Sequence, residues 1–579
     1  MEKQQENKTV ARKIGVNLIE RSIVLSHTGK YLMGCVEGSI RVWNASTGHI
    51  ARNIENAHQN TAVMCLSLHP SQPDLLYSAG GDGHLNLWNY DTGILLKSII
   101  LDENLCITFL KISHAKPDED FFFIACKRSG EERKQPAVSR IFHFNAKYKM
   151  LRKVAKAKSC TGFDLSKCGR FIALASSRHL YLIDVEKSKS KNDSTCEMFS
   201  HVHSRTISCC RIDPQGEYIC FGDEQGKLMK IYCFPPKQGS LKDVSNPTVT
   251  EYHWHAHEVA DMQFSEQGNF MISGGEEAVM VKWRVETNES AFLPRLPAAI
   301  RKVGMSADES KYFAATKSNS IVVISAMDFQ VCCTIEGLEI AAFKSEEAVM
   351  LSCHPITNHV YLSGGIPGYL QVYDHCHDRV VSSIQISNQN IVSRISQEEI
   401  KFFRLIKCEF SSSGAWMITC EEREKWENKL KFWCFDEATQ QYKLKTVVNN
   451  PHSKEIRSLA VYEGRNGRLL AATSGNDHLV KIWGCTNNAW FAMKTLAYKG
   501  GPATSCSFSS DGSLLAASFG RFIALYNGFN FKLIQVLVND SPRSIKQISF
   551  LNNSPFLICS STDRLNVWNL LSLSRKHPF

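Results

Sequence analysis

Histidine, hydroxyl and acid side chains recur along this chain in a pattern that could perform nucleophilic chemistry. Two sets show the full pattern: His58, Ser78, Asp82 and Trp88, and His452, Thr473, Asp477 and Trp483. In a hydrolase, such an acid would orient the histidine, and the histidine would take the proton of the hydroxyl. Here, however, each hydroxyl lies ten residues before a tryptophan and each acid lies six residues before it. The fixed tryptophan spacing favours a structural role over a catalytic triad.

The tryptophan explains the pattern, because an indole N–H can only donate a hydrogen bond and needs an acceptor when it is buried. The hydroxyl can accept from the indole and donate to the histidine, whose other ring nitrogen can reach the carboxylate. A fully satisfied buried network of this kind fixes one local geometry. The arrangement is typical of a WD40 repeat, in which four antiparallel strands form one blade of a β-propeller.

A third set is nearly complete, with glutamate in the place of the aspartate. Its members are His255, Ser273, Glu277 and Trp283. The histidine of this set is either His255 or His257, and the spacing to Val259 favours His255. Because His253, His255 and His257 alternate along one predicted strand, they could together bind a metal ion. One blade histidine flanked by two solvent-exposed ones is the simpler interpretation, so we predict no metal site.

No other catalytic pattern is present. The chain has no G-x-S-x-G elbow, no phosphate-binding G-x-x-x-x-G-K-[ST] loop and no H-E-x-x-H motif. The serine, histidine and acid side chains of the sets are already assigned to blades. We therefore expect a protein that is not an enzyme, carries no cofactor and takes no small-molecule substrate.

Repeats of this size determine the domain organisation of the 579-residue chain. Short alternating strands separated by turn residues mark about twelve blade-like segments. Seven of them, within residues 10–330, predict a first WD40 propeller. The others predict a second propeller over residues 335–579 with about five blades, or six if residues 380–400 supply strands. We expect an all-β fold of tandem propellers whose second ring is incomplete at the C-terminus.

Several predicted blades lack the hydrogen-bonding set. The fifth has Gln225 and Ile231 where the acid and the tryptophan would lie. The seventh ends in Val322-Val323-Ile324. These two blades are predicted to depend on apolar packing between neighbouring sheets alone. The twelfth keeps Trp568, but its acid is shifted to Asp563. Local stability should therefore vary from blade to blade.

Charge and composition narrow the choice of partners. The formal net charge of +10 weakly favours an anionic partner such as nucleic acid. No stretch reaches the roughly 18 apolar residues of a membrane-spanning helix, so no membrane partner is predicted. The first eight residues contain no apolar run, and we expect no secretory leader.

The 21 cysteines lie mostly in apolar runs and are expected to be reduced, buried thiols.

The densest basic run spans residues 147–158. Its cationic residues are Lys147, Lys149, Arg152, Lys153, Lys156 and Lys158. The run lies between predicted blades three and four, so we expect it in a surface connection. There it could follow the phosphate backbone of RNA, with Tyr148 stacking on a base. A solvated loop is the alternative, because scattered lysines are common in loops.

The sixth blade resembles one family in detail. The matching segments are residues 254–262, 273–284 and 292–296, the last of which reads Phe-Leu-Pro-Arg-Leu. Further matches at 364–373, 503–516 and 568–572 continue in order along almost the whole chain. With these segments the chain resembles the family of WD repeat-containing protein 75 and yeast Utp17. The Phe-Leu-Pro-Arg-Leu element is specific to the resemblance, whereas blade motifs alone are not.

The resemblance implies a non-enzymatic scaffold of ribosome biogenesis in the nucleus and nucleolus. That family belongs to the UtpA (t-UTP) subcomplex of the small-subunit processome and acts in transcription by RNA polymerase I and in 18S rRNA processing. The implied partners are other processome proteins and the 5′ external transcribed spacer of the pre-rRNA, contacted directly or indirectly. Family members continue beyond the position of Phe579, so the resemblance also implies a truncated chain.

The repeats alone leave another class open. A generic WD40 adaptor would recruit substrates to a ubiquitin ligase or serve vesicle traffic. A nucleolar location and bound spacer RNA would separate the two interpretations.

Overall fold

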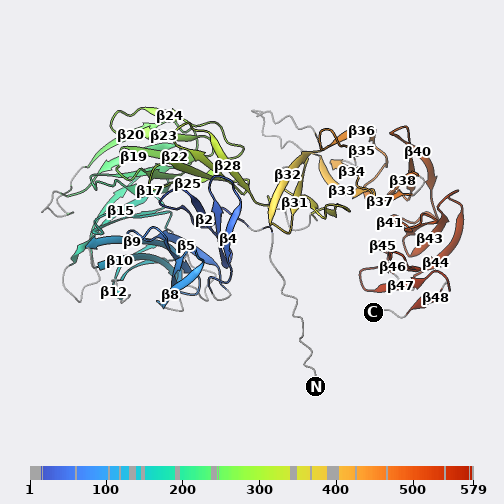
Figure 1. The fold of residues 1–579 in the computed structure, drawn as a ribbon, viewed down its shortest axis with the longest axis horizontal. Coiled ribbons are helices and arrows are strands. Elements are labelled where there is room, and N and C mark those ends of the chain that lie inside the picture. Colours follow the sequence, from blue (N-terminus) through green and yellow to red (C-terminus); the bar gives the residue numbers. More distant parts are fainter. Residues whose placement is uncertain are drawn as a thin grey trace, which may run out of the picture. The chain divides into compact units, whose positions relative to one another are not determined.

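The computed structural model describes residues 15–576 apart from short gaps. The gaps are residues 16, 59–60, 102–104, 117–118, 129–137, 145–149, 159, 189–195, 236–240, 242–243, 245–246, 340–348, 366–367, 388–402, 424–426, 465–466, 540–542 and 573. The elements of the described part are β-strands, and they form four-stranded antiparallel sheets (Figure 1). The prediction of an all-β fold is confirmed. The chain divides into two compact units, Met1–Gly337 and Leu338–Phe579.

The first unit contains seven described sheets, each built from four consecutive strands. Its strands are β1 (Ile23–Leu25), β2 (Tyr31–Val36), β3 (Ser39–Asn44), β4 (Ile50–Ile54), β5 (Val63–Leu68), β6 (Leu75–Gly80), β7 (His84–Asn89), β8 (Ile94–Ile100), β9 (Leu105–Lys116), β10 (Glu119–Arg128), β11 (Val138–Phe144), β12 (Met150–Lys158), β13 (Gly162–Leu165), β14 (Phe171–Ser176), β15 (His179–Ser188), β16 (Cys196–Val202), β17 (Ile207–Ile212), β18 (Ile219–Asp223), β19 (Lys227–Tyr232), β20 (Thr248–His253), β21 (Val259–Phe264), β22 (Phe270–Gly275), β23 (Met280–Arg284), β24 (Ser290–Phe292), β25 (Ile300–Met305), β26 (Lys311–Thr316), β27 (Ser320–Ser325) and β28 (Val331–Glu336).

The second unit contains five described sheets of the same kind. Its strands are β29 (Leu351–Cys353), β30 (Val360–Ser363), β31 (Tyr369–Asp374), β32 (Arg379–Gln385), β33 (Arg404–Phe410), β34 (Trp416–Arg423), β35 (Glu427–Asp436), β36 (Gln441–Asn449), β37 (Ile456–Glu463), β38 (Leu469–Gly475), β39 (Val480–Thr486), β40 (Ala489–Leu496), β41 (Ala503–Phe508), β42 (Leu514–Phe519), β43 (Phe522–Asn527), β44 (Leu533–Val538), β45 (Gln547–Phe550), β46 (Phe556–Ser560), β47 (Leu565–Asn569) and β48 (Ser574–Lys576).

Within each sheet, every strand pairs with the next one along the chain, so the strands alternate in direction. The turn between the second and third strands therefore lies at the same end of the sheet as the connection from the fourth strand to the next sheet. We call this the 2–3 end. In the sheet β5–β8, for example, the second strand β6 is almost fully buried, whereas the fourth strand β8 is largely exposed. In that sheet the apolar residues of the middle strands therefore face neighbouring sheets.

The sheets of the first unit close into a ring (Figure 1). Each pair of neighbouring sheets shares an apolar cluster, such as the one between β1–β4 and β5–β8 that contains Met33, Leu66 and Trp88. The seventh sheet packs against the first in the same way through Phe313 and Trp43. Strand β25 also contacts β1. The first unit thus has a continuous apolar core running around a ring of first strands.

The sheets of the second unit follow one another along an arc (Figure 1). Apolar clusters join each sheet to the next, and Phe432 stacks on Trp490 at 4.4 Å between ring centroids. Among the described residues, no cluster joins the sheet β45–β48 to the sheet β29–β32. Leu351 of β29 is 71% exposed and Leu565 of β47 is 41% exposed. Most of residues 380–400, which could supply a sixth blade, lies outside the described residues.

The cysteines within the described residues are thiols rather than disulfides, and half of them are buried. Burial raises the pKa of Cys35 and Cys209 to about 12. These thiols therefore stay protonated and pack as small apolar side chains. The described residues include no helix of the length and apolar character needed to cross a membrane.

Candidate functional site

The structure brings the four residues of the first set together in the sheet β5–β8. Trp88 on β7 donates its indole N–H to Ser78 Oγ on β6 at 2.9 Å. Ser78 Oγ lies 2.8 Å from Nε2 of His58, and Nδ1 of His58 lies 3.0 Å from Asp82 Oδ1. His58 comes from the connection that precedes β5, and Asp82 comes from the turn between β6 and β7. The set, which we call a relay, links that connection to the two middle strands.

The other two sets form the same relay with nearly the same distances. In the sheet β21–β24, Ser273 Oγ accepts from Trp283 Nε1 at 2.8 Å and lies 2.8 Å from His255 Nε2. Nδ1 of His255 lies 3.1 Å from Glu277 Oε2. His255, not His257, therefore fills the histidine position.

In the sheet β37–β40, Thr473 Oγ1 accepts from Trp483 Nε1 at 3.0 Å and lies 2.9 Å from His452 Nε2. Nδ1 of His452 lies 3.0 Å from Asp477 Oδ1. The three relays thus share one geometry, in which either serine or threonine supplies the hydroxyl and either aspartate or glutamate supplies the carboxylate.

The proton positions in a relay follow from its partners. A carboxylate can only accept, so Nδ1 of the histidine carries the proton that it donates to the acid. Burial lowers the pKa of His255 and of His452, and their hydrogen bonds to Glu277 and Asp477 offset this only in part. The neutral imidazole then leaves Nε2 as an acceptor for the hydroxyl proton.

The pKa values of the relay acids shift in the direction that keeps these acids ionised. Burial raises the pKa of Asp82 and of Asp477, but the histidine hydrogen bonds and the backbone N–H groups outweigh it and hold both below the usual value. Ser78 and Thr473 are fully buried and already use their hydroxyls as donor and acceptor. A relay therefore holds strands and turns together and presents no nucleophile to a substrate.

The fifth sheet, β17–β20, has a partial relay that the sequence prediction missed. His203 Nε2 lies 3.2 Å from Asp223 Oδ2, and Asp223 is 1% exposed. Its other oxygen accepts from the backbone N–H groups of Gln225 and Lys227 at 3.0 and 2.8 Å. The acid therefore lies two residues before the position assigned to it. The prediction that this blade depends on apolar packing alone is wrong.

Other sheets keep only fragments of the relay. In the sheet β33–β36, Trp433 donates its indole N–H to Thr419 Oγ1 at 3.0 Å. In the sheet β45–β48, the indole nitrogen of Trp568 has no hydrogen-bond partner among the described residues. Asp563 instead accepts from Ser561 Oγ at 2.6 Å within its own turn. The shifted acid of the twelfth blade thus does not reach its tryptophan.

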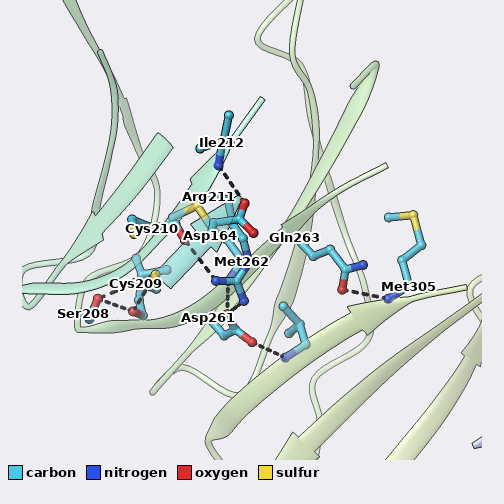
Figure 2. Close-up of polar contacts among 12 residues, drawn as sticks. Asp164, Ser208, Cys209, Cys210, Arg211, Ile212, Asp261, Met262, Gln263 and Met305 are labelled. Carbon is cyan, nitrogen blue, oxygen red and sulfur yellow. Dashed lines mark hydrogen bonds and ion pairs between the residues drawn. The ribbon is translucent and has the colours of Figure 1, made fainter. Parts of the chain in front are cut away.

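The first strands of neighbouring sheets carry a second polar network, which the sequence did not predict (Figure 2). Asp164 of β13 accepts from the backbone N–H of Ile212 in β17 at 2.9 Å and pairs with Lys111 of β9 at 3.0 Å. Arg211 of β17 donates to Asp261 of β21 at 2.8 Å. Burial lowers the pKa of Arg211, but the carboxylates of Asp261 and Asp164 outweigh it and raise the pKa.

The network continues around the ring. The second oxygen of Asp261 accepts from the backbone N–H of Val303 in β25 at 3.3 Å. Likewise, Gln263 Oε1 accepts from the backbone N–H of Met305 at 3.2 Å (Figure 2). From β25, Lys302 donates to the carbonyl oxygens of Glu20 and Arg21, which precede β1. We call this the first-strand network. It joins the sheet β21–β24, which has a full relay, to neighbouring sheets that lack one, so the interfaces between these sheets are not purely apolar.

The basic run between blades three and four is not the surface connection that we expected. Met150–Lys158 forms strand β12, which pairs with β11 and buries Val154. Lys147 and Lys149 lie outside the described residues. The side chains of Arg152, Lys153, Lys156 and Lys158 are also outside the described part. Their contact with RNA stays a prediction.

The three alternating histidines are divided between two environments. His255 is buried in its relay, whereas His253 and His257 are exposed. Within the described residues, no three histidine, cysteine, aspartate or glutamate side chains are grouped in a way that could hold a metal ion.

The repeated four-stranded sheets and their Trp–hydroxyl–His–acid relays define a WD40 β-propeller protein with two tandem units. Residues 24–319 match the family model of the first β-propeller of WD repeat-containing protein 75, and residues 351–577 match that of the second. The chain belongs to this family. The predictions of tandem propellers and of this family are confirmed.

Individual relatives extend the match. WD repeat-containing protein 75 of Xenopus laevis is 28% identical over 592 residues, which cover 97% of this chain and 68% of the relative. U3 small nucleolar RNA-associated protein 17 of Schizosaccharomyces pombe is 23% identical over 62% of this chain and 49% of its own length. NET1-associated nuclear protein 1 of Saccharomyces cerevisiae is 22% identical over 64% of this chain and 48% of its own length.

Proposed function

We propose that this chain is a non-catalytic scaffold of ribosome biogenesis that works in the nucleolus. The observation that carries the proposal is the family match over both propellers, together with a relative named for its association with U3 small nucleolar RNA. A second relative is named as a nuclear protein. Within this function, we assign the chain to the UtpA (t-UTP) subcomplex of the small-subunit processome, acting in transcription by RNA polymerase I and in 18S rRNA processing.

The geometry suits a scaffold. Relays and the first-strand network fix the middle and first strands, while turns and fourth strands remain at the surface of each sheet. A rigid framework presenting many loops can bind several partners at once, and linked weak contacts add up to strong overall binding. The proposed partners are other processome proteins and the 5′ external transcribed spacer of the pre-rRNA.

Purification of the tagged full chain from growing cells tests the proposal. Sequencing of the co-purified RNA should recover U3 small nucleolar RNA and the 5′ spacer, and imaging should place the tag in nucleoli. Depletion should make precursors of 18S rRNA accumulate, with maturation of the large-subunit rRNA as the internal control. An RNA-free cytoplasmic protein bound to ubiquitin-ligase or vesicle-coat subunits would reject the proposal in favour of a generic adaptor.

A further inference from the structure

Aromatic and cationic side chains gather at the 2–3 end of the second unit, in a place that no relay occupies. We call this group the Tyr498 patch. It consists of Tyr498, Lys499, Arg521, Phe522 and Lys546.

Three neighbouring connections supply the patch. Tyr498 and Lys499 lie between β40 and β41, Arg521 and Phe522 lie at the tight turn between β42 and β43, and Lys546 directly precedes β45. Because the turn joins a second strand to a third, and both longer connections join a fourth strand to a first, all three lie at one end of their sheets.

Backbone hydrogen bonds hold these connections in place. The N–H of Gly520 donates to the carbonyl of Pro502 at 3.0 Å, and the N–H of Ile545 donates to the carbonyl of Gly520 at 2.9 Å. The N–H of Asn539 donates to the carbonyl of Arg521 at 2.9 Å. The central turn is therefore tied to the connections on both sides, and the patch is organised before any ligand arrives.

The two rings of the patch and two of its cations are already close together. The ring of Tyr498 meets that of Phe522 edge to face, with 5.8 Å between centroids. Lys499 Nζ lies 5.1 Å from the centroid of Phe522, and Arg521 Cζ lies 5.3 Å from it. Both rings are partly exposed, and Lys499, Arg521 and Lys546 are exposed. Within the described residues, none of these three cations forms an ion pair.

We propose that the Tyr498 patch binds single-stranded RNA. An unpaired strand offers base faces to partly exposed rings and phosphates to unpaired cations, which is the combination found in single-strand binding surfaces. A duplex keeps its bases stacked internally and could use only the cations. An acidic peptide would likewise need the cations but not the rings. The proposal deepens the proposed function by naming a surface, and it rests on that function for the choice of RNA.

The turn at the centre of the patch differs from several turns of the first unit. Four turns between second and third strands in the first unit carry the acids Glu37, Asp82, Glu224 and Glu276, whereas the turn between β42 and β43 carries Arg521 and no acid. A carboxylate at that position would repel a phosphate backbone. The turn between β42 and β43 is therefore better suited to a phosphate than those four turns.

A second aromatic and cationic cluster lies at the same end of the second unit, two sheets from the patch. There Lys429 Nζ lies 4.1 Å and Arg423 Cζ 4.7 Å from the ring centroid of Phe403. Arg423 also pairs with Glu427, which reduces its charge toward a ligand. This cluster offers an extended strand a further point for stacking, whereas Lys499, Arg521 and Lys546 of the patch have no ion pair among the described residues.

Fluorescence anisotropy with the purified full chain tests the proposal. The probe is fluorescein-labelled oligouridine of about 12 nucleotides, within the usual range of single-strand sites. The triple variant K499Q/R521Q/K546Q should bind at least about tenfold more weakly at 0.1 M salt and should flatten the plot of log affinity against log salt concentration by about 2, since each phosphate contact in a single strand contributes about 0.7.

The aromatic residues have a different expected signature. Tyr498→Leu and Phe522→Leu keep an apolar side chain, so each should weaken binding about fivefold to tenfold while leaving the salt dependence unchanged. Lys532→Gln is the matched control, because Lys532 is exposed in the same sheet but lies in the turn between β43 and β44, at the opposite end. Circular dichroism of each variant should show unchanged folding.

Each outcome decides the question. Binding by the triple variant equal to wild type, loss of binding in Lys532→Gln, or absence of oligouridine binding by the wild-type chain would overturn the proposal. Equal competition by polyglutamate, with no effect of the leucine variants, would replace RNA by an acidic protein. If the patch variants lose oligouridine while the wild-type chain recovers no U3 or spacer RNA from cells, the proposed function fails and the patch stands. If both wild-type and triple-variant chains recover those RNAs but anisotropy shows no patch dependence, only the patch fails.

Discussion

Replacing Thr473 with valine removes one hydroxyl from the relay of the sheet β37–β40 and almost nothing else, because the two side chains have nearly the same shape. Thr473 Oγ1 accepts from Trp483 at 3.0 Å and contacts His452 at 2.9 Å. All three side chains are at most 4% exposed, so water cannot replace the lost partner.

The cost follows from these contacts. Two hydrogen bonds at about 1 kcal/mol each are lost, and a buried indole N–H and a ring nitrogen are left unpaired, which gives a total of about 2–5 kcal/mol. Because about 1.4 kcal/mol corresponds to a factor of ten, local opening of the sheet should become roughly 30-fold to 4,000-fold more frequent.

Native-state hydrogen exchange of the full chain measures this directly at the amides of β38 and β39. Thr473→Ser is the matched control, since Ser78 and Ser273 form the same relay in the first unit. It removes only a methyl group and should cost about 1 kcal/mol. If the valine and serine variants exchange at the same rates, the relay hydroxyl contributes nothing and the argument fails.

Three further predictions use the same measurement. Asp223→Ala removes a carboxylate that accepts two backbone N–H groups, so exchange in the β18–β19 turn should rise about tenfold to a hundredfold; unchanged exchange would exclude a role for Asp223. Arg211→Met removes the guanidinium that pairs with Asp261 and should lower the stability of β17 and β21 by about 2 kcal/mol. This loss is smaller than that for breaking a fully buried ion pair, because Arg211 is 23% exposed. Adding Asp261→Asn should restore part of the lost stability. Burial lowers the pKa of His255 in the folded state, so the unfolded state binds more protons below about pH 6.5. The stability of β22 should therefore fall as the pH is lowered below about 6.5. His255→Gln should remove this pH dependence.

The relays were predictable from the sequence because most of their members are close along the chain. The hydroxyl and the tryptophan of a relay are ten residues apart and the acid lies between them. That spacing is set by one turn between two paired strands, so local geometry dictates it. Only the histidine comes from outside this segment, which is why His255 and His257 could not be fully separated from sequence alone.

The missed contacts are those without such a local frame. With Ile231 in place of a tryptophan, nothing in the sequence marked Asp223 as the acid of its sheet. Arg211 and Asp261 are 50 residues apart and meet only because their sheets are neighbours. A usable signal was present, since charged residues rarely lie within apolar strands unless they are paired. In the basic run, the dense charge hid the strand that buries Val154.

The two polar networks act in different directions, and this difference connects stability to binding. A relay ties a connection at the 2–3 end to the middle strands of one sheet, whereas the first-strand network ties one sheet to the next. In the sheet β41–β44, Tyr526 lies where a relay would have its tryptophan. The 2–3 end of this sheet is held by backbone hydrogen bonds of Gly520 and Ile545 and by Thr504 Oγ1, which donates to the carbonyl of Ile545. The side chains of Arg521 and Phe522 are therefore not needed to hold that turn. They can contact a ligand while the backbone beneath them stays fixed.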